Sequence, residues 1–222
     1  MKKINKIYLG VVYDALREMG HKLESFYIDI KPKFTNNQII IGPALTTKGR
    51  KVKKNENYSK LDNIRIDIYK KKLFKNNPIV LLQANDNKVA HAGDITCQIY
   101  KSLGAIGFIT DGNIRDIDKC EEINFPIFCQ NTNPIDAIDY WALTEFQKNI
   151  TIKNVLIKPG DMIYASNDGV IRVKKSDFFK FERKLSQILN KENDVRKLIK
   201  KISNMRDFKK PLINFLKKRG RW

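Results

Sequence analysis

The fold is decided by a stretch near the middle of the chain, Gly104-Ala105-Ile106-Gly107-Phe108-Ile109-Thr110-Asp111-Gly112-Asn113-Ile114-Arg115-Asp116. Residues 105–109 are small or apolar and predict a buried strand, and Asp111-Gly112-Asn113 predicts a turn after it. A helical pattern precedes this strand at residues 91–103, and a third buried strand follows at 125–129. Strands that alternate with helices predict an α/β protein with a parallel βαβ core.

Toward the N-terminus, apolar residues recur at three- and four-residue steps across residues 3–20. This spacing predicts an amphipathic helix that ends at Gly20. The polar and basic residues 46–60 predict a loop. The other expected elements on this side are strands at 26–30, 38–45 and 78–83 and a helix at 62–72.

The C-terminal part of the chain begins with short strands and ends with helices. Strands are expected at 151–157, 162–165 and 170–173, around turns at 159–161 and 167–169. The chain is expected to be helical from Ser176 onward, with Ser176 as the N-cap. No low-complexity linker separates these parts, so we expect one domain, residues 1–175, with a basic helical extension at 176–222.

Composition excludes several classes of protein. Hydrophobic residues make up 42% of the chain and charged residues 30%, which is typical of a globular protein. The apolar runs are too short to cross a membrane, and residues 1–6 lack the apolar region of a signal peptide. The cysteines Cys97, Cys120 and Cys129 form no CxxC motif and are expected to be buried free thiols. These features predict a cytoplasmic protein.

The net charge of +19 raises the question of a nucleic-acid partner. Residues 174–222 contain 17 Lys or Arg and 5 Asp or Glu, which gives +12 of the +19. No known RNA- or DNA-binding motif accompanies this charge. The chain is also rich in Asn and Ile, whose codons, like those of Lys, are AT-rich. We therefore favour a solvated basic helical face over a nucleic-acid-binding surface, which stays the alternative.

Three features predict a site for an anionic ligand, namely a helix start at Gly93-Asp94, a strand that leads into the turn at Asp111-Gly112, and Arg115-Asp116 after that turn. Gly93-Asp94 opens a helix, so the backbone N–H groups of Ile95 and Thr96 are free to bind a carboxylate. Arg115-Asp116 follows a strand end, and in parallel α/β proteins these ends share one crevice. Each feature also has a plain structural interpretation, namely a helix cap, a weak surface salt bridge and a turn. His91 is interpreted as a helix-start or loop histidine.

The spacing of these residues resembles a known family. Residues 93–94, 104–116 and 125–128 are similar to the RraA-like family, which contains 4-hydroxy-4-methyl-2-oxoglutarate aldolases and regulators of ribonuclease activity. The aldolase branch carries an Asp, twenty residues, and then Arg-Asp. Asp94 and Arg115 are separated by 20 residues and Asp116 follows. Weaker similarity extends over residues 8–175. The resemblance implies a swivelling β/β/α domain, a central β core flanked by helices.

The resemblance also implies roles for individual residues. Asp116 would hold a divalent cation, Mg²⁺ or Mn²⁺, largely through water. Arg115 would contact the keto oxygen of the substrate and stabilise an enolate. Asp94 would position a water that moves a proton to or from the methyl carbon of pyruvate, and the amides of Ile95 and Thr96 would bind the carboxylate. No Schiff-base lysine and no nicotinamide-binding motif is required.

The expected function is that of a metal-dependent carbon–carbon lyase. It would cleave 4-hydroxy-2-oxo acids to pyruvate and also decarboxylate oxaloacetate. The family implies a homotrimer or a dimer of trimers, with a Glu contributed by the neighbouring subunit, for which Glu192 is the nearest match. The alternative is a non-catalytic regulator that binds a ribonuclease or a helicase. Regulators of that branch tend to lack the complete set of Asp94, Arg115 and Asp116.

Overall fold

A computed structural model of the chain describes residues 7–34, 39–202 and 209–218. Its centre is a nine-stranded mixed sheet in the order β1-β11-β10-β2-β3-β5-β4, with β6 paired to β5 and β7 paired to β2. The strands of this sheet are β1 (Tyr27–Ile28), β2 (Ile40–Lys51), β3 (Ile79–Gln83), β4 (Ala90–Ala92), β5 (Gly107–Ile114), β6 (Ile127–Thr132), β7 (Trp141–Phe146), β10 (Met162–Ser166) and β11 (Gly169–Val173). Strands β8 (Ile150–Ile152) and β9 (Val155–Ile157) form a separate hairpin, where the sequence predicted one strand at 151–157.

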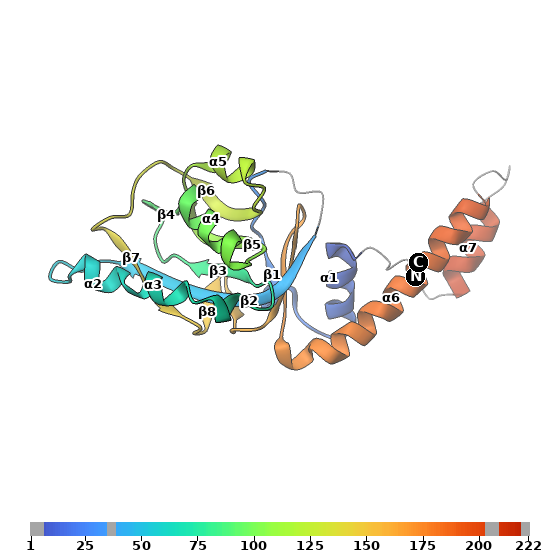
Figure 1. Ribbon diagram of the computed structural model, residues 1–222. Helices are drawn as coiled ribbons and strands as arrows, with labels where there is room; N and C mark the ends of the chain where they lie inside the picture. The colour runs from blue at the N-terminus through green and yellow to red at the C-terminus, as the bar shows by residue number, and fades with distance from the viewer. Residues whose placement is uncertain (1–6, 35–38, 203–208, 219–222) are drawn as a thin grey trace.

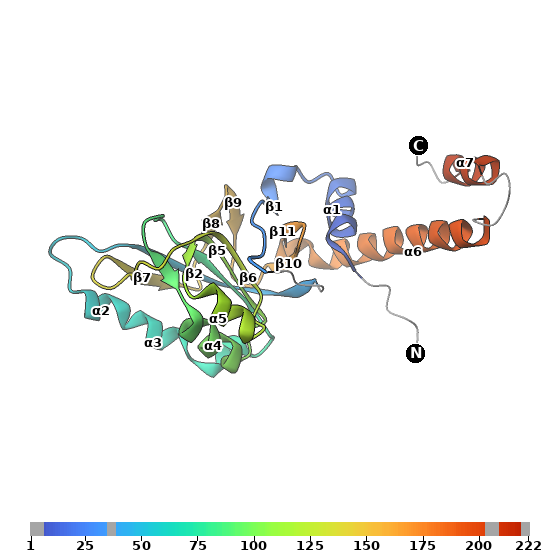
Figure 2. The ribbon, with the colours of Figure 1, turned by 90° about the horizontal axis from the view of Figure 1, so that it is seen from above.

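The helices lie around this sheet and beyond it (Figures 1 and 2). Their bounds are α1 (Leu9–Glu18), α2 (Tyr58–Asp62), α3 (Ile64–Ile68), α4 (Asp94–Leu103), α5 (Ile117–Glu122), α6 (Phe178–Ile202) and α7 (Lys209–Lys218). Residues 3–6 of the predicted N-terminal helix and residue 38 of a predicted strand lie outside the described residues. The remaining part of the first helix is confirmed as α1, and the α/β fold class is confirmed.

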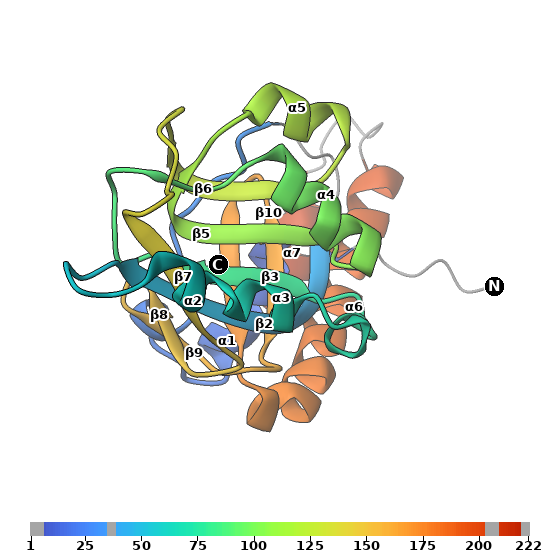
Figure 3. The ribbon, with the colours of Figure 1, turned by 60° about the vertical axis from the view of Figure 1, so that its left-hand side comes forward.

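The parallel core is also confirmed. Strands β2, β3, β5 and β6 pair with one another in parallel and lie side by side in Figure 3, with α4 on the near side. Their carboxyl ends therefore point toward the same edge of the sheet. This edge carries the residues that the sequence selected as a candidate site.

The predicted turn at Asp111-Gly112-Asn113 is wrong, because β5 continues through these residues to Ile114. Asn113 pairs with Ala90 of β4 and with Asn131 of β6, and the β6 register shifts between Thr110 and Asn113. Gly112 is required at this irregularity, since a Cβ there would lie 2.4 Å from Nδ1 of His91. The strand thus extends directly to Arg115 instead of turning before it.

Helix α4 begins at Asp94 and not at residue 91, because Ala90–Ala92 form the short strand β4. His91 is therefore a buried strand residue rather than a helix-start or loop residue. At the other end, Gly104 adopts the left-handed conformation with φ 111°, and the amide of Ala105 donates to the carbonyl of Tyr100 at 2.9 Å. This Gly-terminated end is a common way to stop a helix before a strand.

The predicted loop at 46–60 is also wrong in its first part. Strand β2 runs to Lys51, with β3 on one side and β7 on the other, and β7 was not predicted. Two neighbouring strands supply hydrogen bonds that override the polar local sequence. The hydroxyl of Thr47 donates to the carbonyl of Leu81 at 2.9 Å, which satisfies a buried polar group. Trp141 of β7 packs directly on Gly49, where a Cβ would clash with its ring.

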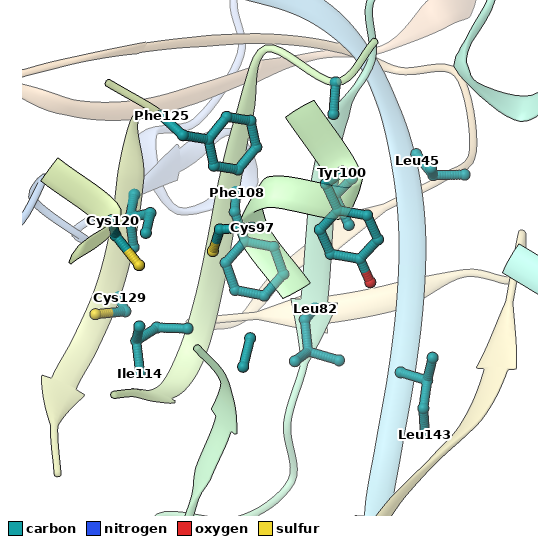
Figure 4. Close-up of a cluster of buried hydrophobic side chains, with 14 of the residues drawn as sticks. Leu45, Leu82, Cys97, Tyr100, Phe108, Ile114, Cys120, Phe125, Cys129 and Leu143 are labelled. Carbon is teal, nitrogen blue, oxygen red and sulfur yellow. The ribbon is translucent and has the colours of Figure 1, made fainter. Parts of the chain in front are cut away.

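One hydrophobic core lies between the sheet and helices α4 and α5 (Figure 4). Tyr100 stacks on Phe108 with ring centroids 5.9 Å apart. Cys97, Cys120 and Cys129 are buried and free, as predicted. A hydrogen bond with Cys120 and burial raise the pKa of Cys97, and burial raises the pKa of Cys129 to about 12. The thiols of Cys97 and Cys129 are therefore protonated packing groups rather than nucleophiles.

The described parts of the C-terminal extension are mostly helical, as expected, in α6 and α7. The first half of α6 buries Phe181, Leu185 and Ile188 in a cluster with α1, and the second half runs away from the sheet (Figure 1). Ser176 is not the N-cap of α6, because it lies in a 3-10 turn and hydrogen-bonds to the carboxylate of Asp177. Among the described residues, no helix has both the length and the apolar character to cross a membrane.

Candidate active site

Arg115 and Asp116 lie at the carboxyl end of β5, where the chain turns into α5. The amide of Arg115 donates to the carbonyl of Ala92 at 3.1 Å, which continues the pairing with β4. Asp116 has φ 57° and ψ 40°, a left-handed conformation that is uncommon for a residue other than glycine. Such backbone geometry is often found at functional sites. It aims the two side chains back toward the start of α4.

Gly93 is in direct contact with both residues. A Cβ on Gly93 would lie 2.7 Å from Oδ2 of Asp116 and 3.0 Å from Cγ of Arg115. Any larger residue would therefore displace the Arg115 and Asp116 side chains. The structure thus brings together three of the residues predicted from the sequence, Gly93, Arg115 and Asp116.

The first turn of α4 faces the same place. Gly93 is the N-cap residue and has no side chain to satisfy the amides of this turn. Asp94 is the first residue of the helix and is partly buried, Ile95 is exposed and Thr96 is partly buried. The amides of Ile95 and Thr96 belong to a turn whose N–H groups have no intrahelical acceptors, so they can bind an anion.

Arg115 is held between two carboxylates. Its Nε lies 3.2 Å from Oδ2 of Asp116, and its Nη1 donates to Oδ2 of Asp136 at 2.8 Å. The three side chains are 38%, 40% and 44% exposed, so solvent and ligands reach them. Asp136 was not predicted from the sequence. It follows β6, a neighbouring parallel strand, and this position was the signal that could have identified it.

The donor set fits a hard divalent cation. Within the described residues, no three His, Cys, Asp or Glu side chains gather in a cluster able to hold a metal ion. Asp116 instead offers one partly exposed carboxylate at the mouth of the site. Mg²⁺ characteristically keeps several waters and binds through one or two carboxylates, and Mn²⁺ accepts the same oxygen ligands. Asp116 therefore fits either cation.

A buried histidine supports the end of β5. Nδ1 of His91 accepts from the amide of Asn113 at 3.1 Å, and Nε2 lies 3.3 Å from Oδ2 of Asp86. This pairing places the proton on Nε2, because Nδ1 acts as the acceptor. Burial lowers the pKa of His91, although Asp86 opposes the shift. His91 thus fixes the strand two residues before Arg115 as a neutral group.

Glu192 lies on α6 rather than beside Arg115. Within this chain it accepts hydrogen bonds from the hydroxyl of Tyr8 and from Nη2 of Arg196, the latter at 3.2 Å. Helix α6 runs away from the carboxyl end of β5 (Figures 1 and 2). A role for Glu192 in the site of a neighbouring subunit stays a prediction.

The sequence of this chain is similar to those of known proteins. The family described as RraA-like, Aldolase/RraA, matches residues 10–172. The chain belongs to the RraA-like family. A relative from Halalkalibacterium halodurans, provisionally named 4-hydroxy-4-methyl-2-oxoglutarate aldolase, is 35% identical over 149 residues. This match covers 66% of the chain and spans 64% of the length of that relative.

Two solved structures share the fold of this chain. A Streptomyces coelicolor protein, described as an unusual member of the RNase ES inhibitor RraA protein family, aligns with a TM-score of 0.72 and 21% identity. That alignment covers 91% of this chain and 94% of the Streptomyces chain. An uncharacterised protein from Pseudomonas syringae aligns with a TM-score of 0.72 and 19% identity, over 90% of both chains. At these identities the likeness concerns the fold.

Proposed function

We propose that this RraA-like protein is a divalent-metal-dependent lyase. It cleaves 4-hydroxy-2-oxo acids to pyruvate and decarboxylates oxaloacetate as a second activity. The observation that carries the proposal is the contact of Gly93 with Arg115 and Asp116. This contact brings together a helix start that can bind an anion, a guanidinium and a carboxylate that can bind a metal. The name of the Halalkalibacterium halodurans relative adds support for the reaction class.

The proposed binding mode uses the first turn of α4. The carboxylate of the 2-keto acid accepts from the amides of Ile95 and Thr96, and the guanidinium of Arg115 donates to the keto oxygen. Asp116 would hold the cation, Mg²⁺ or Mn²⁺, chiefly through water. When bound, the cation supplies positive charge that favours the enolate form of the keto acid.

Cleavage is a retro-aldol step that breaks the C3–C4 bond of the substrate. The C4 hydroxyl of the substrate gives its proton to the water that Asp94 positions, the C3–C4 bond breaks, and C4 becomes a carbonyl. The electron pair of that bond becomes the C2=C3 double bond, and the π pair of the keto group moves to the C2 oxygen, which becomes the enolate oxygen of pyruvate. Arg115 already donates to this oxygen, so the hydrogen bond strengthens as negative charge develops. In oxaloacetate, loss of CO₂ leaves the same enolate.

Asp94 controls the proton that is added to C3 of the enolate. It positions a water that delivers a proton to C3 of the enolate and so produces the methyl group of pyruvate. In the reverse direction the same water removes a methyl proton. Glu192 of a neighbouring subunit completes the site in a homotrimer or a dimer of trimers. The three buried free cysteines suit a reducing compartment, so we place this activity in the cytoplasm.

The second candidate is a regulator that binds a ribonuclease or a helicase. The Streptomyces coelicolor structure belongs to an inhibitor family, and the fold is shared. The complete set of Asp94, Arg115 and Asp116 favours the lyase. A non-catalytic regulator would not need these side chains to lie together near Gly93.

Pyruvate release tests the proposal. The protein is incubated with 4-hydroxy-2-oxo acids and with oxaloacetate, with Mg²⁺, with Mn²⁺ and with EDTA. We expect metal-dependent pyruvate release that Asp116→Ala abolishes while the variant keeps its circular dichroism spectrum and its oligomeric state. Turnover by Asp116→Ala in EDTA at the wild-type rate would contradict the assignment of the metal, and no pyruvate from any substrate would contradict the lyase.

A further inference from the structure

Two pockets lie at the amino end of the parallel strands, the opposite edge of the sheet from Arg115. One has a volume of about 280 Å³ and is lined by residues 43–45 of β2 and by Pro78, which directly precedes β3. The other has a volume of about 460 Å³ and is lined by Arg172 of β11 and by residues 174–176, which follow that strand. Pro159 and Lys175 line both pockets, so one ligand can contact the two.

The walls of these pockets carry a concentrated positive charge. Their exposed cations are all lysines, namely Lys72, Lys75, Lys158, Lys174 and Lys175. Within the part of the chain that the structure describes, none of these five lysines forms an ion pair with a carboxylate. In contrast, Lys48, Lys70 and Lys119 elsewhere on the surface lie 3.6, 2.7 and 3.0 Å from a carboxylate oxygen. The five ammonium groups are therefore available to a ligand.

The carboxylate in the walls does not balance this charge. Asp161 is 3% exposed, and its Oδ2 lies 2.7 Å from Nε of Arg172, so these two charges neutralise each other. The described lining residues include no other Asp or Glu. A recess lined by charge of one sign attracts ions of the opposite sign. The pockets are therefore suited to an anion with several charges.

The backbone between the pockets is held in place by Asp161. Its carboxylate accepts from the amides of Lys158 and Lys175, both at 2.9 Å, and its carbonyl accepts from the amide of Ala44 at 2.8 Å. Gly160 has φ 82°, and a Cβ there would lie 3.6 Å from Cδ and 4.0 Å from Nζ of Lys175. The side chain of Lys175 thus lies over this turn. Two of the lysines start from fixed backbone positions, which lowers the cost of ordering them around a ligand.

The type of cation favours phosphate over carboxylate groups. Lysine binds phosphate as a point charge, whereas planar recognition of carboxylates favours arginine. Arg172 is already occupied by Asp161. Moreover, none of the described residues in the two walls is aromatic, whereas proteins that bind single-stranded nucleic acids stack the bases on aromatic rings. Two bounded pockets without such rings fit a compact polyphosphate better than a nucleic acid.

We propose that the two pockets form a binding site for a compact polyphosphate anion, either inorganic or the phosphate chain of a nucleotide. Lys175 binds it where the pockets meet, Lys158 and Lys174 bind it from one pocket, and Lys72 and Lys75 from the other. The site is separate from Arg115 and Asp116 and does not depend on the proposed lyase activity.

Calorimetry with inorganic triphosphate, in buffer free of divalent cations, tests the site. We expect the wild type to bind triphosphate at least about tenfold more tightly than inorganic phosphate, because the longer anion reaches more lysines. Lys175→Gln should weaken triphosphate binding by about tenfold, the usual effect of losing one hydrogen bond to a charged group. The variant keeps the backbone amide that binds Asp161, and its circular dichroism spectrum should match the wild type.

Lys54→Gln is the matched control. It removes the same charge from an exposed lysine in the loop between β2 and α2. Helix α2 lies at the opposite end of the sheet from the start of α6, which Lys175 precedes (Figures 1 and 2). Distant surface charges are screened by salt, so the affinity should stay within about twofold of the wild type. Equal losses in Lys54→Gln and Lys175→Gln, or no triphosphate binding at all, would overturn the inference.

Three further measurements separate the alternatives. Arg115→Gln should bind triphosphate as the wild type does, and a loss there with full affinity in Lys175→Gln would place the anion at the keto acid site and overturn the inference. ATP that binds as tightly as triphosphate would assign the phosphate chain of a nucleotide, and much weaker ATP binding would assign the inorganic anion; both results support the site. A short single-stranded RNA that displaces triphosphate and binds more tightly would show a nucleic-acid surface and overturn the compact ligand.

Discussion

Two aspartate–arginine pairs on the same sheet have opposite surroundings. Nε of Arg172, on β11, lies 2.7 Å from Oδ2 of Asp161, and the two side chains are 5% and 3% exposed. Asp161 also accepts from the amides of Lys158 and Lys175, both at 2.9 Å. Arg115 and Asp116 lie 3.2 Å apart and are 38% and 40% exposed.

The difference shows what burial does to the same pair of residue types. The Asp161 carboxylate is almost fully buried and accepts hydrogen bonds from protein donors on both oxygens, so it holds Lys158, Lys175 and β11 together. The Arg115–Asp116 pair contributes little to stability, because water screens it. Its donors and acceptors stay available for a keto acid and a cation. The buried pair stabilises the fold, whereas the exposed pair is available to bind a substrate and a cation.

The largest expected effect is on stability at the buried pair. Asp161→Ala leaves Arg172 buried without a partner, which typically costs about 3–5 kcal/mol of unfolding free energy. Chemical denaturation measures this loss. Asp161→Asn, which keeps an acceptor oxygen, should lose less. A loss below about 1 kcal/mol in Asp161→Ala would show that the buried pair is not structural.

At the exposed pair the effect should fall on turnover instead. Arg115→Lys keeps the charge but loses the planar donor fork, and loss of one donor to a developing oxyanion costs about 10²–10³ in turnover. Its unfolding free energy should change by less than about 1 kcal/mol. Steady-state pyruvate release and denaturation of the same preparation decide the matter. A stability loss as large as that of Asp161→Ala would remove the contrast between the two pairs.

A moderate pH effect should come from His91, which is buried against the end of β5. Burial lowers its pKa from 6.5 in the folded state, so below that pH the unfolded chain binds more protons than the folded chain. The contribution of neutral His91 to the unfolding free energy is therefore fully present above pH 6.5, and it is lost as the pH falls below that value. The unfolding free energy at pH 7.5 and 5.5 measures this change. His91→Asn should show a smaller decrease, and an equal decrease would assign the effect to other groups.

The smallest effect on stability is expected at the ion pair between Arg115 and Asp136. Asp136→Asn keeps the acceptor for Ile138 and removes one half-exposed ion pair, so stability should change by less than about 1 kcal/mol. Thermal unfolding in low and high salt measures it. A loss of several kcal/mol would mean that the loop depends on this pair.

Sequence reasoning succeeded where the signal was local. The βαβ pattern followed from short apolar runs, and Asp94, Arg115 and Asp116 were selected because their spacing resembles that of the RraA-like family. The longer β2 was missed because its polar second half is stabilised by β7, which lies about 90 residues further along the chain. Asp136 and the Asp161–Arg172 pair were missed for the same reason. Their partners meet only in the folded sheet.

The roles of Arg115 and Asp94 can be separated by the reactions they affect. Loss of either side chain should lower turnover by similar factors, about 10²–10³ for an oxyanion donor and about 10²–10⁴ for an acid–base group. Proton exchange distinguishes them. Decarboxylation of oxaloacetate reaches the enolate without removal of a carbon-bound proton, whereas exchange of the pyruvate methyl hydrogens requires it.

The most direct test is therefore NMR-monitored exchange of the pyruvate methyl hydrogens in D₂O, run beside an oxaloacetate decarboxylation assay on Asp94→Asn. We expect the variant to bind pyruvate and metal, to lose methyl exchange and to keep much more of its decarboxylation. Arg115→Lys should lower both reactions together. Equal losses of exchange and decarboxylation in Asp94→Asn would contradict the role of Asp94, and absence of metal-dependent exchange in the wild type would contradict the enolate chemistry itself.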